Sequence, residues 1–172
     1  MKIEILKPFG PSIVKLKIPN QIVDEMNKYT DEINWSGFLE LACQEWFEKE
    51  NNFKFKKFEI LKSWIVRQFK NEYNPVHYHN GHVSGVGYLK VPESLGKTVQ
   101  ENKKTNYNGK LVLIDGSKKI FCKASHTITP RVGDFYLFPN YLMHAVYPFS
   151  DSEDERRSVS FNAIFDNESA NI

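Results

Sequence analysis

The spacing of apolar residues along this chain changes twice. Residues 3–19, IEILKPFGPSIVKLKIP, alternate apolar and polar positions around a turn rich in proline and glycine, which predicts one or two short strands. Residues 21–33 and 35–51 carry apolar side chains three and four positions apart, as amphipathic helices do. In the second helix we interpret one apolar stripe as core, formed by Phe38, Leu39, Leu41, Ala42, Trp46 and Phe47.

Strand-like segments follow residue 52 almost to the end of the chain. Gly, Pro, Asn and Asp separate them at intervals typical of an all-β sandwich or barrel. One longer polar connection, residues 92–109, predicts a surface loop. Helices before strands indicate a β-sandwich backed by N-terminal helices. The predicted strands lie within residues 53–60, 62–69, 82–91, 109–115, 119–130, 134–139, 144–149 and 156–165.

Composition narrows the class of protein. With 172 residues, 41% of them hydrophobic, the chain is long enough for one globular domain, residues 1–172. Its 23 basic and 21 acidic side chains are spread along the sequence, so we expect neither a nucleic-acid partner nor a membrane partner. Cys43 and Cys122 form no CxxC pair or disulfide framework, and each is expected to be a small buried residue in a reducing cytoplasm. No signal-peptide segment or membrane-length apolar run is apparent, which also favours a cytoplasmic location.

Three of the five histidines lie within the stretch NPVHYHNGH, residues 74–82. In an extended strand His77 and His79 share one face and Tyr78 lies on the other, so two imidazoles could bind one transition metal. Imidazole suits Fe, Zn, Cu, Ni and Co. His82 follows the turn signal Asn80-Gly81, so strand phase does not predict its direction. The alternative is a polar, exposed loop without metal.

A fourth histidine follows a strand and a proline-containing turn. In PRVGDFYLFPNYLMHAVYPF, a Gly-Asp turn at Gly133 and Asp134 precedes a short apolar strand, and His144 comes after the next turn. That position could deliver a third ligand from across a sandwich. His144 could instead be a core histidine, but the upstream histidine pair favours a ligand.

The last predicted strand, within ERRSVSFNAIF, has a polar face. Arg156 and Ser158 lie side by side on it and could hold a carboxylate, the guanidinium in a bidentate manner and the hydroxyl by one further hydrogen bond. Simple solvent exposure of the polar face is the alternative. Alternation places Arg156, Ser158, Ser160 and Asn162 on this face, and Arg157, Val159 and Phe161 on the other.

In combination, these motifs resemble the Fe(II)/2-oxoglutarate-dependent oxygenases, which share His-x-Asp/Glu on one strand, a distal His, and Arg-x-Ser/Thr about a dozen residues later. The blocks SGV-x-YL, GD-x-x-x-FP-x-x-x-x-H and ER-x-S-x-SFN more closely resemble a family of such oxygenases often found in phages, in which HxH replaces HxD. The resemblance spans about residues 64–162. It implies a mainly β fold with a double-stranded β-helix core (jelly-roll, cupin-like) at residues 53–166, preceded by an N-terminal strand and α-helices at residues 1–52. For a phage-encoded chain the location would be the host cytoplasm.

The resemblance also implies a metal site. His77 and His144 would be the two histidine ligands of Fe(II), and His79 stands where the superfamily has its carboxylate ligand. An imidazole in place of a carboxylate raises the net charge of the site by one. Asp134 and Asp115 are alternative carboxylates, although neither has the expected spacing.

A cosubstrate site follows from the same likeness. Arg156 and Ser158 would bind the distal carboxylate of 2-oxoglutarate, and Tyr88 stands where strand neighbours of the cosubstrate are found. The chain departs from the pattern at Gly87, where a second aromatic residue is expected, and at Arg157, where an apolar residue is usual.

The activity implied is that of a dioxygenase that hydroxylates an unidentified substrate and releases succinate and carbon dioxide. Small prolyl-hydroxylase-like members of the superfamily act on peptides, which suggests a protein or peptide substrate beside the small-molecule cosubstrate.

Two other functions compete with this interpretation. A cupin-type three-histidine metalloprotein that does not use 2-oxoglutarate would also carry HxH, and the segment from Gly133 to His144 partly matches its second motif. However, Val83 and Ser84 occupy the positions of the usual cupin glutamate, Tyr141 replaces a glycine, and a cupin has no need of Arg-x-Ser. A non-catalytic binding domain on the same fold is the third possibility.

Four further residues have no fixed place relative to the predicted site. His126 lies on a predicted strand outside the motifs and is expected at an exposed or edge position. Trp64, Arg67 and Gln68 precede the histidine strand and could line the pocket; core packing for the tryptophan and a surface position for the other two are equally compatible with the sequence.

Overall fold

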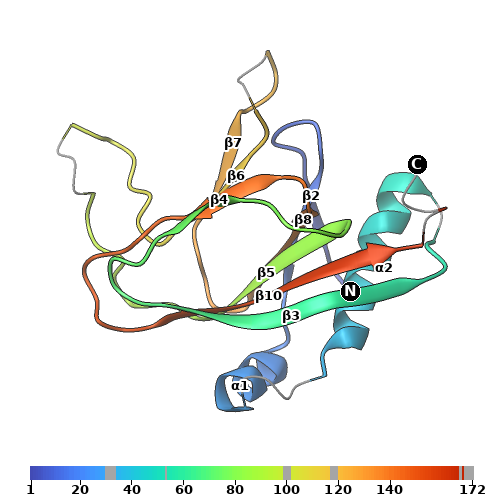
Figure 1. The fold of residues 1–172 in the computed structure, drawn as a ribbon, viewed down its shortest axis with the longest axis horizontal. Coiled ribbons are helices and arrows are strands. Elements are labelled where there is room, and N and C mark those ends of the chain that lie inside the picture. The colour runs from blue at the N-terminus through green and yellow to red at the C-terminus, as the bar shows by residue number, and fades with distance from the viewer. Residues whose placement is uncertain (30–33, 53, 99–101, 117–119, 167, 169–172) are drawn as a thin grey trace.

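Two antiparallel sheets form the framework of the chain (Figure 1). The computed structural model describes residues 1–29, 34–52, 54–98, 102–116, 120–166 and 168. The larger sheet has six strands in the order β1-β2-β8-β5-β10-β3. In that order the strands are Glu4–Leu6, Ile13–Lys17, Asp134–Pro139, Val83–Lys90, Arg156–Phe165 and Phe58–Gln68.

The smaller sheet carries four short strands in the order β4-β9-β6-β7. It carries His77 and His144, and it lies across an apolar layer from the larger sheet. Residues from both sheets meet in this layer, among them Val86 and Tyr136 from the larger sheet and Leu111 and Leu113 from the smaller. The four strands are Asn74–His77, Met143–Val146, Leu111–Ile114 and Ser125–Ile128.

The predicted strand pattern is largely confirmed, with two differences. The two strands expected within residues 53–69 form one strand, β3, because a bulge at Leu61 lets the chain continue past a register shift against β10. The strand expected over residues 119–130 is reduced to β7, Ser125–Ile128. In the polar loop at residues 92–109, the described residues contain no helix or strand, and residues 99–101 lie outside the described part.

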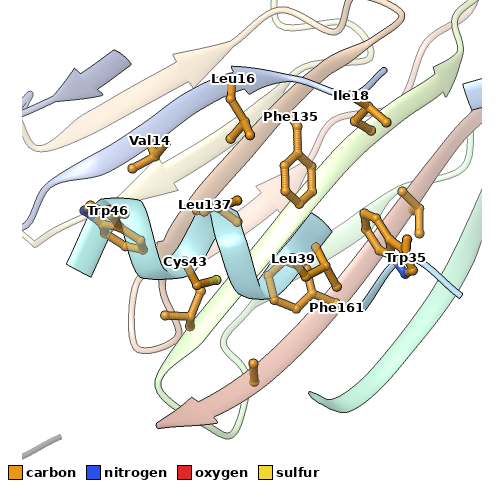
Figure 2. Close-up of a cluster of buried hydrophobic side chains, with 14 of the residues drawn as sticks. Val14, Leu16, Ile18, Trp35, Leu39, Cys43, Trp46, Phe135, Leu137 and Phe161 are labelled. Atoms are coloured by element: carbon orange, nitrogen blue, oxygen red, sulfur yellow. The ribbon is translucent and has the colours of Figure 1, made fainter. Parts of the chain in front are cut away.

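Both predicted helices are present, as α1, Asn20–Tyr29, and α2, Ser36–Asn51. Residues 30–33 of the first predicted helix lie outside the described part. Figure 2 shows α2 packed on the larger sheet, with Leu39 of the helix and Phe135 and Leu137 of β8 in one buried cluster. The longest helix has 16 residues, and among described residues no helix combines the length and apolar character needed to cross a bilayer.

One member of the predicted helical stripe was wrong. Leu41 is 65% exposed, because it lies two positions beyond Leu39 and therefore nearly opposite to it on the helix. Cys43, four positions beyond Leu39, fills the core position and is fully buried as predicted. Cys122 is only partly buried, on the rim of the layer between the sheets, so full burial there was also wrong.

Two glycines on β5 allow the helices and the larger sheet to pack closely. A Cβ atom at Gly85 would lie 2.3 Å from a ring carbon of Phe161, and one at Gly87 would lie 2.4 Å from Cδ1 of Ile18. The absence of a second aromatic residue at position 87 therefore has a steric reason: Ile18 and Phe135 occupy that space. The other face of β5 carries Tyr88 into the layer between the sheets.

Candidate functional site

The three histidines singled out by the motifs lie together at one end of the smaller sheet. His77 ends β4 and is paired in register with His144 on β9, while His79 lies two residues beyond β4. Their ring centroids are 4.2 Å apart for His77 and His144, 5.0 Å for His77 and His79, and 4.9 Å for His79 and His144. One ligand atom from each histidine lies within 4.8 Å of the others, and Tyr78 between them is exposed, as the alternation predicted.

Backbone carbonyls orient two of the three imidazoles. Nδ1 of His77 lies 2.6 Å from the carbonyl oxygen of Pro75, and Nδ1 of His144 lies 2.9 Å from that of Leu142. Because a carbonyl only accepts, each Nδ1 must donate, which leaves Nε2 with its lone pair free. Such a hydrogen bond on the far nitrogen is the usual support of a metal-ligating histidine.

The free nitrogens converge on one point. Nε2 of His144 lies 3.2 Å from Nε2 of His79. Burial lowers the pKa of His144 to about 4, and burial together with the neighbouring His77 lowers the pKa of His79. His79 and His144 are therefore neutral at pH 7, the form in which histidine binds a metal. The three imidazoles could hold one transition-metal ion.

Asn140, in the turn between β8 and β9, fixes the segment that carries His79. The backbone N–H of His79 donates to the carbonyl of Asn140 at 3.2 Å, and the side-chain amide of Asn140 donates to the carbonyl of His79 at 2.9 Å. The N–H of Asn140 also donates to the carbonyl of His82. The sequence motifs gave no signal for this residue, because its contacts exist only after the two turns meet.

A cavity of about 440 Å³ opens beside the histidines. This volume is within the range of small-molecule sites. Its walls include His77, His79 and His144 on one side and Arg156 and Ser158 of β10 on the other. The two halves of the predicted site therefore border the same space.

Arg156 is the strongest electrostatic feature of the cavity. The residue is only 1% exposed, and two of its guanidinium nitrogens, Nε and Nη2, are buried without a hydrogen-bond partner in the described protein. Burial lowers its pKa, yet a guanidinium stays charged at neutral pH. Among the described residues no carboxylate pairs with this buried cation, which is costly, so the arrangement fits an anionic ligand with paired oxygens.

Tyr88 and Ser158 lie next to this guanidinium. Ser158 is the register partner of Tyr88 across β10 and β5, and the guanidinium carbon of Arg156 lies 5.1 Å from the centre of the Tyr88 ring. The buried Tyr88 hydroxyl makes no hydrogen bond of standard geometry among the described residues; burial raises its pKa to about 12 and outweighs the opposing effect of the nearby Arg156 guanidinium, so the hydroxyl keeps its proton. Arg156, Ser158 and Tyr88 together could hold a carboxylate.

Glu155, adjacent in sequence, does not neutralise Arg156. Its carboxylate accepts two hydrogen bonds from Arg157, at 2.7 and 2.8 Å, and two from Arg67, at 2.8 and 3.2 Å. These contacts, those of Arg157 above all, hold the pKa of Glu155 at about 2. Arg157 also donates to Asn27 of α1, which gives the unexpected arginine a structural reason.

The other candidate residues have different roles. His82 accepts a hydrogen bond from the backbone of Phe165, and His126 lies on the edge strand β7, as predicted. Asp134 is buried against Lys15 and Lys17. Within the described chain, neither Asp134 nor Asp115 joins the histidine group, so neither supplies a substitute carboxylate. Trp64, Arg67 and Gln68 all border the cavity, as one of their two predicted placements required.

The chain is similar to known proteins at the level of family and fold. A sequence profile described as "Putative 2OG-Fe(II) oxygenase", where 2OG denotes 2-oxoglutarate, matches residues 62–162. No curated protein sequence matches the chain.

Solved structures with a similar fold share little sequence with this chain. HygX from Streptomyces hygroscopicus, with nickel and 2-oxoglutarate bound, has a TM-score of 0.57 at 13% identity over 89% of this chain and 81% of its own. A prolyl-4-hydroxylase from Pseudomonas putida has a TM-score of 0.56 at 16% identity over 92% and 88%. The viral collagen prolyl hydroxylase of Paramecium Bursaria Chlorella virus-1 has a TM-score of 0.59 at 14% identity, over 88% of this chain and 89% of its own.

At such low identity these likenesses describe the fold, and they confirm its prediction as a double-stranded β-helix. The N-terminal helices are only loosely matched by these neighbours. The association with phages stays a prediction.

Proposed function

This chain belongs to the 2OG-Fe(II) oxygenase family, and we propose that it uses Fe(II) and 2-oxoglutarate to hydroxylate a protein or peptide substrate. Membership of the family gives the class of enzyme and its need for Fe(II) and 2-oxoglutarate. The residue roles and the nature of the substrate are the proposal.

The observation that carries the proposal is the buried, unpaired guanidinium of Arg156 in the same cavity as three converging histidines. The distal carboxylate of 2-oxoglutarate would pair with Arg156 and accept further hydrogen bonds from the hydroxyls of Ser158 and Tyr88. The three donors are brought together by adjacent strands of a rigid sheet, which favours a ligand of fixed length and orientation.

His77, His79 and His144 would hold the metal. The carbonyls of Pro75 and Leu142 keep Nε2 of His77 and His144 available, and Asn140 fixes the backbone of His79. When bound, Fe(II) and 2-oxoglutarate supply oxidation by O₂, in which the cosubstrate becomes succinate and carbon dioxide and a substrate C–H bond becomes C–OH.

The protein's own residues would orient the reactants and exclude water. Phe138 and Trp64 pack their rings against His144 and His79, with centroids 5.2 and 5.6 Å apart. These apolar neighbours limit solvent around His79 and His144, which lowers the pKa of both imidazoles and strengthens electrostatic contacts inside the cavity.

A protein or peptide substrate is supported by two of the structural neighbours, which are named as a prolyl-4-hydroxylase and a collagen prolyl hydroxylase. A cupin-type metalloprotein that does not bind 2-oxoglutarate gives no reason for a buried arginine without a carboxylate partner at position 156. The family match favours an oxygenase over a non-catalytic domain.

An anaerobic titration tests the proposal. Apo-protein receives Fe(II) and then 2-oxoglutarate while the visible spectrum is recorded, and we expect a weak charge-transfer band that requires both components. Succinate should then form in air at a rate that increases with a suitable peptide. Iron binding without the band, and without measurable 2-oxoglutarate binding by calorimetry, would overturn the cosubstrate site and favour the cupin-type function.

A further inference from the structure

One strand, β3, borders two cavities that meet at the histidines. Besides the cavity that contains Arg156, a second cavity of about 510 Å³ is lined by Lys62, Trp64, Tyr78, His79 and Asn162, among others. Trp64 and His79 border both. The second cavity therefore reaches the proposed metal ligands from a different side.

The register of β3 and β10 orders the groups along this path. Arg156 pairs with Gln68 at one end of the ladder, Ser160 pairs with Trp64 four residues further along β10, and Asn162 pairs with Lys62 after two more residues, just before the bulge at Leu61. Because the ring of Trp64 contacts His79, the histidines lie opposite the middle of the ladder. If the cosubstrate takes the Arg156 end, the primary substrate must approach from the direction of Lys62.

The outer edge of β3 has no strand partner among the described residues. β3 is the last strand of the larger sheet and pairs only with β10, on both sides of the bulge at Leu61. Figure 1 shows it along the border of the sheet. From Lys62 to Gln68, beyond the bulge at Leu61, this unpaired edge presents backbone N–H and C=O groups at regular spacing, which an added extended chain can satisfy.

The second cavity offers hydrogen-bond donors and a positive charge. Lys62 has no carboxylate partner in the described protein, and its ammonium nitrogen lies 5.2 Å from the centre of the Trp64 ring. The amide oxygen of Asn162 accepts from the Ser84 hydroxyl at 2.8 Å, which leaves the NH₂ group of Asn162 to donate elsewhere. A carboxylate would satisfy both donors.

Apolar side chains surround these donors. Tyr78 is 66% exposed and Leu61 is 45% exposed, and both line the second cavity. Along an added strand, side chains alternate between the cavity and solvent, so one acidic residue could enter the cavity while neighbouring residues contact this apolar rim.

We propose that the primary substrate is an extended polypeptide segment that adds to the free edge of β3 and places an acidic side chain in the cavity formed by Lys62, Trp64 and Asn162. This inference names the substrate class of the proposed hydroxylase and rests on that function. The residue to be oxidised would lie beside the histidines, next to Trp64.

The test uses a display library of random ten-residue peptides selected on the full-length protein, followed by synthesis of the selected sequences. We expect binders enriched in Asp or Glu. Methylation of backbone nitrogens should weaken binding at least about tenfold at alternate positions and have little effect at the intervening ones, because an edge strand bonds every second residue. The charge-reversing variant Lys62→Glu should also lose at least about tenfold in affinity.

Lys123→Glu, an exposed charge reversal near the far edge of the smaller sheet, is the matched control and should bind as the unmodified protein does. Failure of the selection, uniform sensitivity to methylation, or equal affinity of the Lys62→Glu variant would overturn the inference. Because binding is measured without turnover, peptide binding without 2-oxoglutarate chelation would refute the proposed function alone. Chelation without peptide binding would refute only this inference.

Discussion

Replacement of Arg156 by methionine separates ligand binding from stability. Arg156→Met keeps most of the side-chain volume and removes a buried charge. Two guanidinium nitrogens are unpartnered and available to the cosubstrate, and hydrogen bonds to a charged group contribute about 1.5–3 kcal/mol each. The loss of about 3–6 kcal/mol corresponds to roughly a 10²- to 10⁴-fold increase in the Kd for 2-oxoglutarate.

The same substitution should stabilise the protein without cosubstrate. A buried cation with no partner opposes folding, so its replacement by an apolar side chain should raise the free energy of unfolding by roughly 1–4 kcal/mol. Calorimetry of 2-oxoglutarate binding to metal-loaded protein and urea unfolding of apo-protein measure the two effects. Ser160→Ala, on the same face of β10, is the matched control.

Three results would refute this reasoning for Arg156. One is an unchanged affinity for 2-oxoglutarate in the methionine variant. Another is a parallel loss of metal affinity, since Arg156 belongs to the opposite wall of the cavity from the histidines. The third is a strong destabilisation of the apo-protein, which would mean that the guanidinium is already satisfied in the fold.

Three other substitutions test separate parts of the structure. His79→Asp should bind Fe(II) about tenfold more tightly than the unmodified protein in an anaerobic titration, because a carboxylate adds a negative charge to the site; an unchanged or weaker affinity would remove residue 79 from the ligand set. The pKa of Glu155 is about 2 in the fold and 4.5 in an unfolded chain, so its ionised form stabilises the protein above about pH 4.5 and this contribution disappears as the pH falls toward 2. Glu155→Gln should therefore lower the free energy of urea unfolding by roughly 2 kcal/mol at pH 7 and by less in acid, whereas a pH-independent difference would contradict the ion-pair explanation. Gly85→Ala should destabilise the protein by about 2–3 kcal/mol, because the new Cβ would lie 2.3 Å from a ring carbon of Phe161. Its control, Gly37→Ala in α2, has open space and should stabilise the protein by up to about 1 kcal/mol. Similar thermal unfolding temperatures of the two variants would show that β5 can relax.

Local periodicity carried most of the information about the fold. Alternation identified β10 and the faces of its residues, and helical spacing identified α1 and α2. Periodicity could not show that Leu41 lies outside the buried stripe, because its apolar character resembles that of its neighbours and only the direction of packing distinguishes it. The continuity of β3 through Leu61 was equally hidden, since a bulge depends on the partner strand.

The candidate site divides in a similar way. Histidine, arginine and serine positions could be found because metal and carboxylate chemistry demand particular side chains at particular spacings. Supporting contacts had no such signature. Asn140 donates a hydrogen bond to the backbone carbonyl of His79. Glu155 accepts hydrogen bonds from Arg67, which is 88 residues away in sequence, and does not pair with the adjacent Arg156. These contacts arise from tertiary proximity alone.

The missing carboxylate links the metal site to the proposed substrate. Asp134 forms ion pairs with two lysines, so the ligands of the proposed metal site would be three imidazoles, which do not reduce the charge of a divalent ion. Together the metal and Arg156 then exceed the charge of 2-oxoglutarate by one positive unit, whereas a carboxylate ligand would balance it. A positive centre beside Trp64 should attract the acidic segment that Lys62 also favours. Loading the unmodified protein with a divalent metal ion should therefore tighten the binding of acidic peptides, and equal affinities of the metal-loaded protein and the apo-protein would show that the charge of the metal site does not act on the peptide.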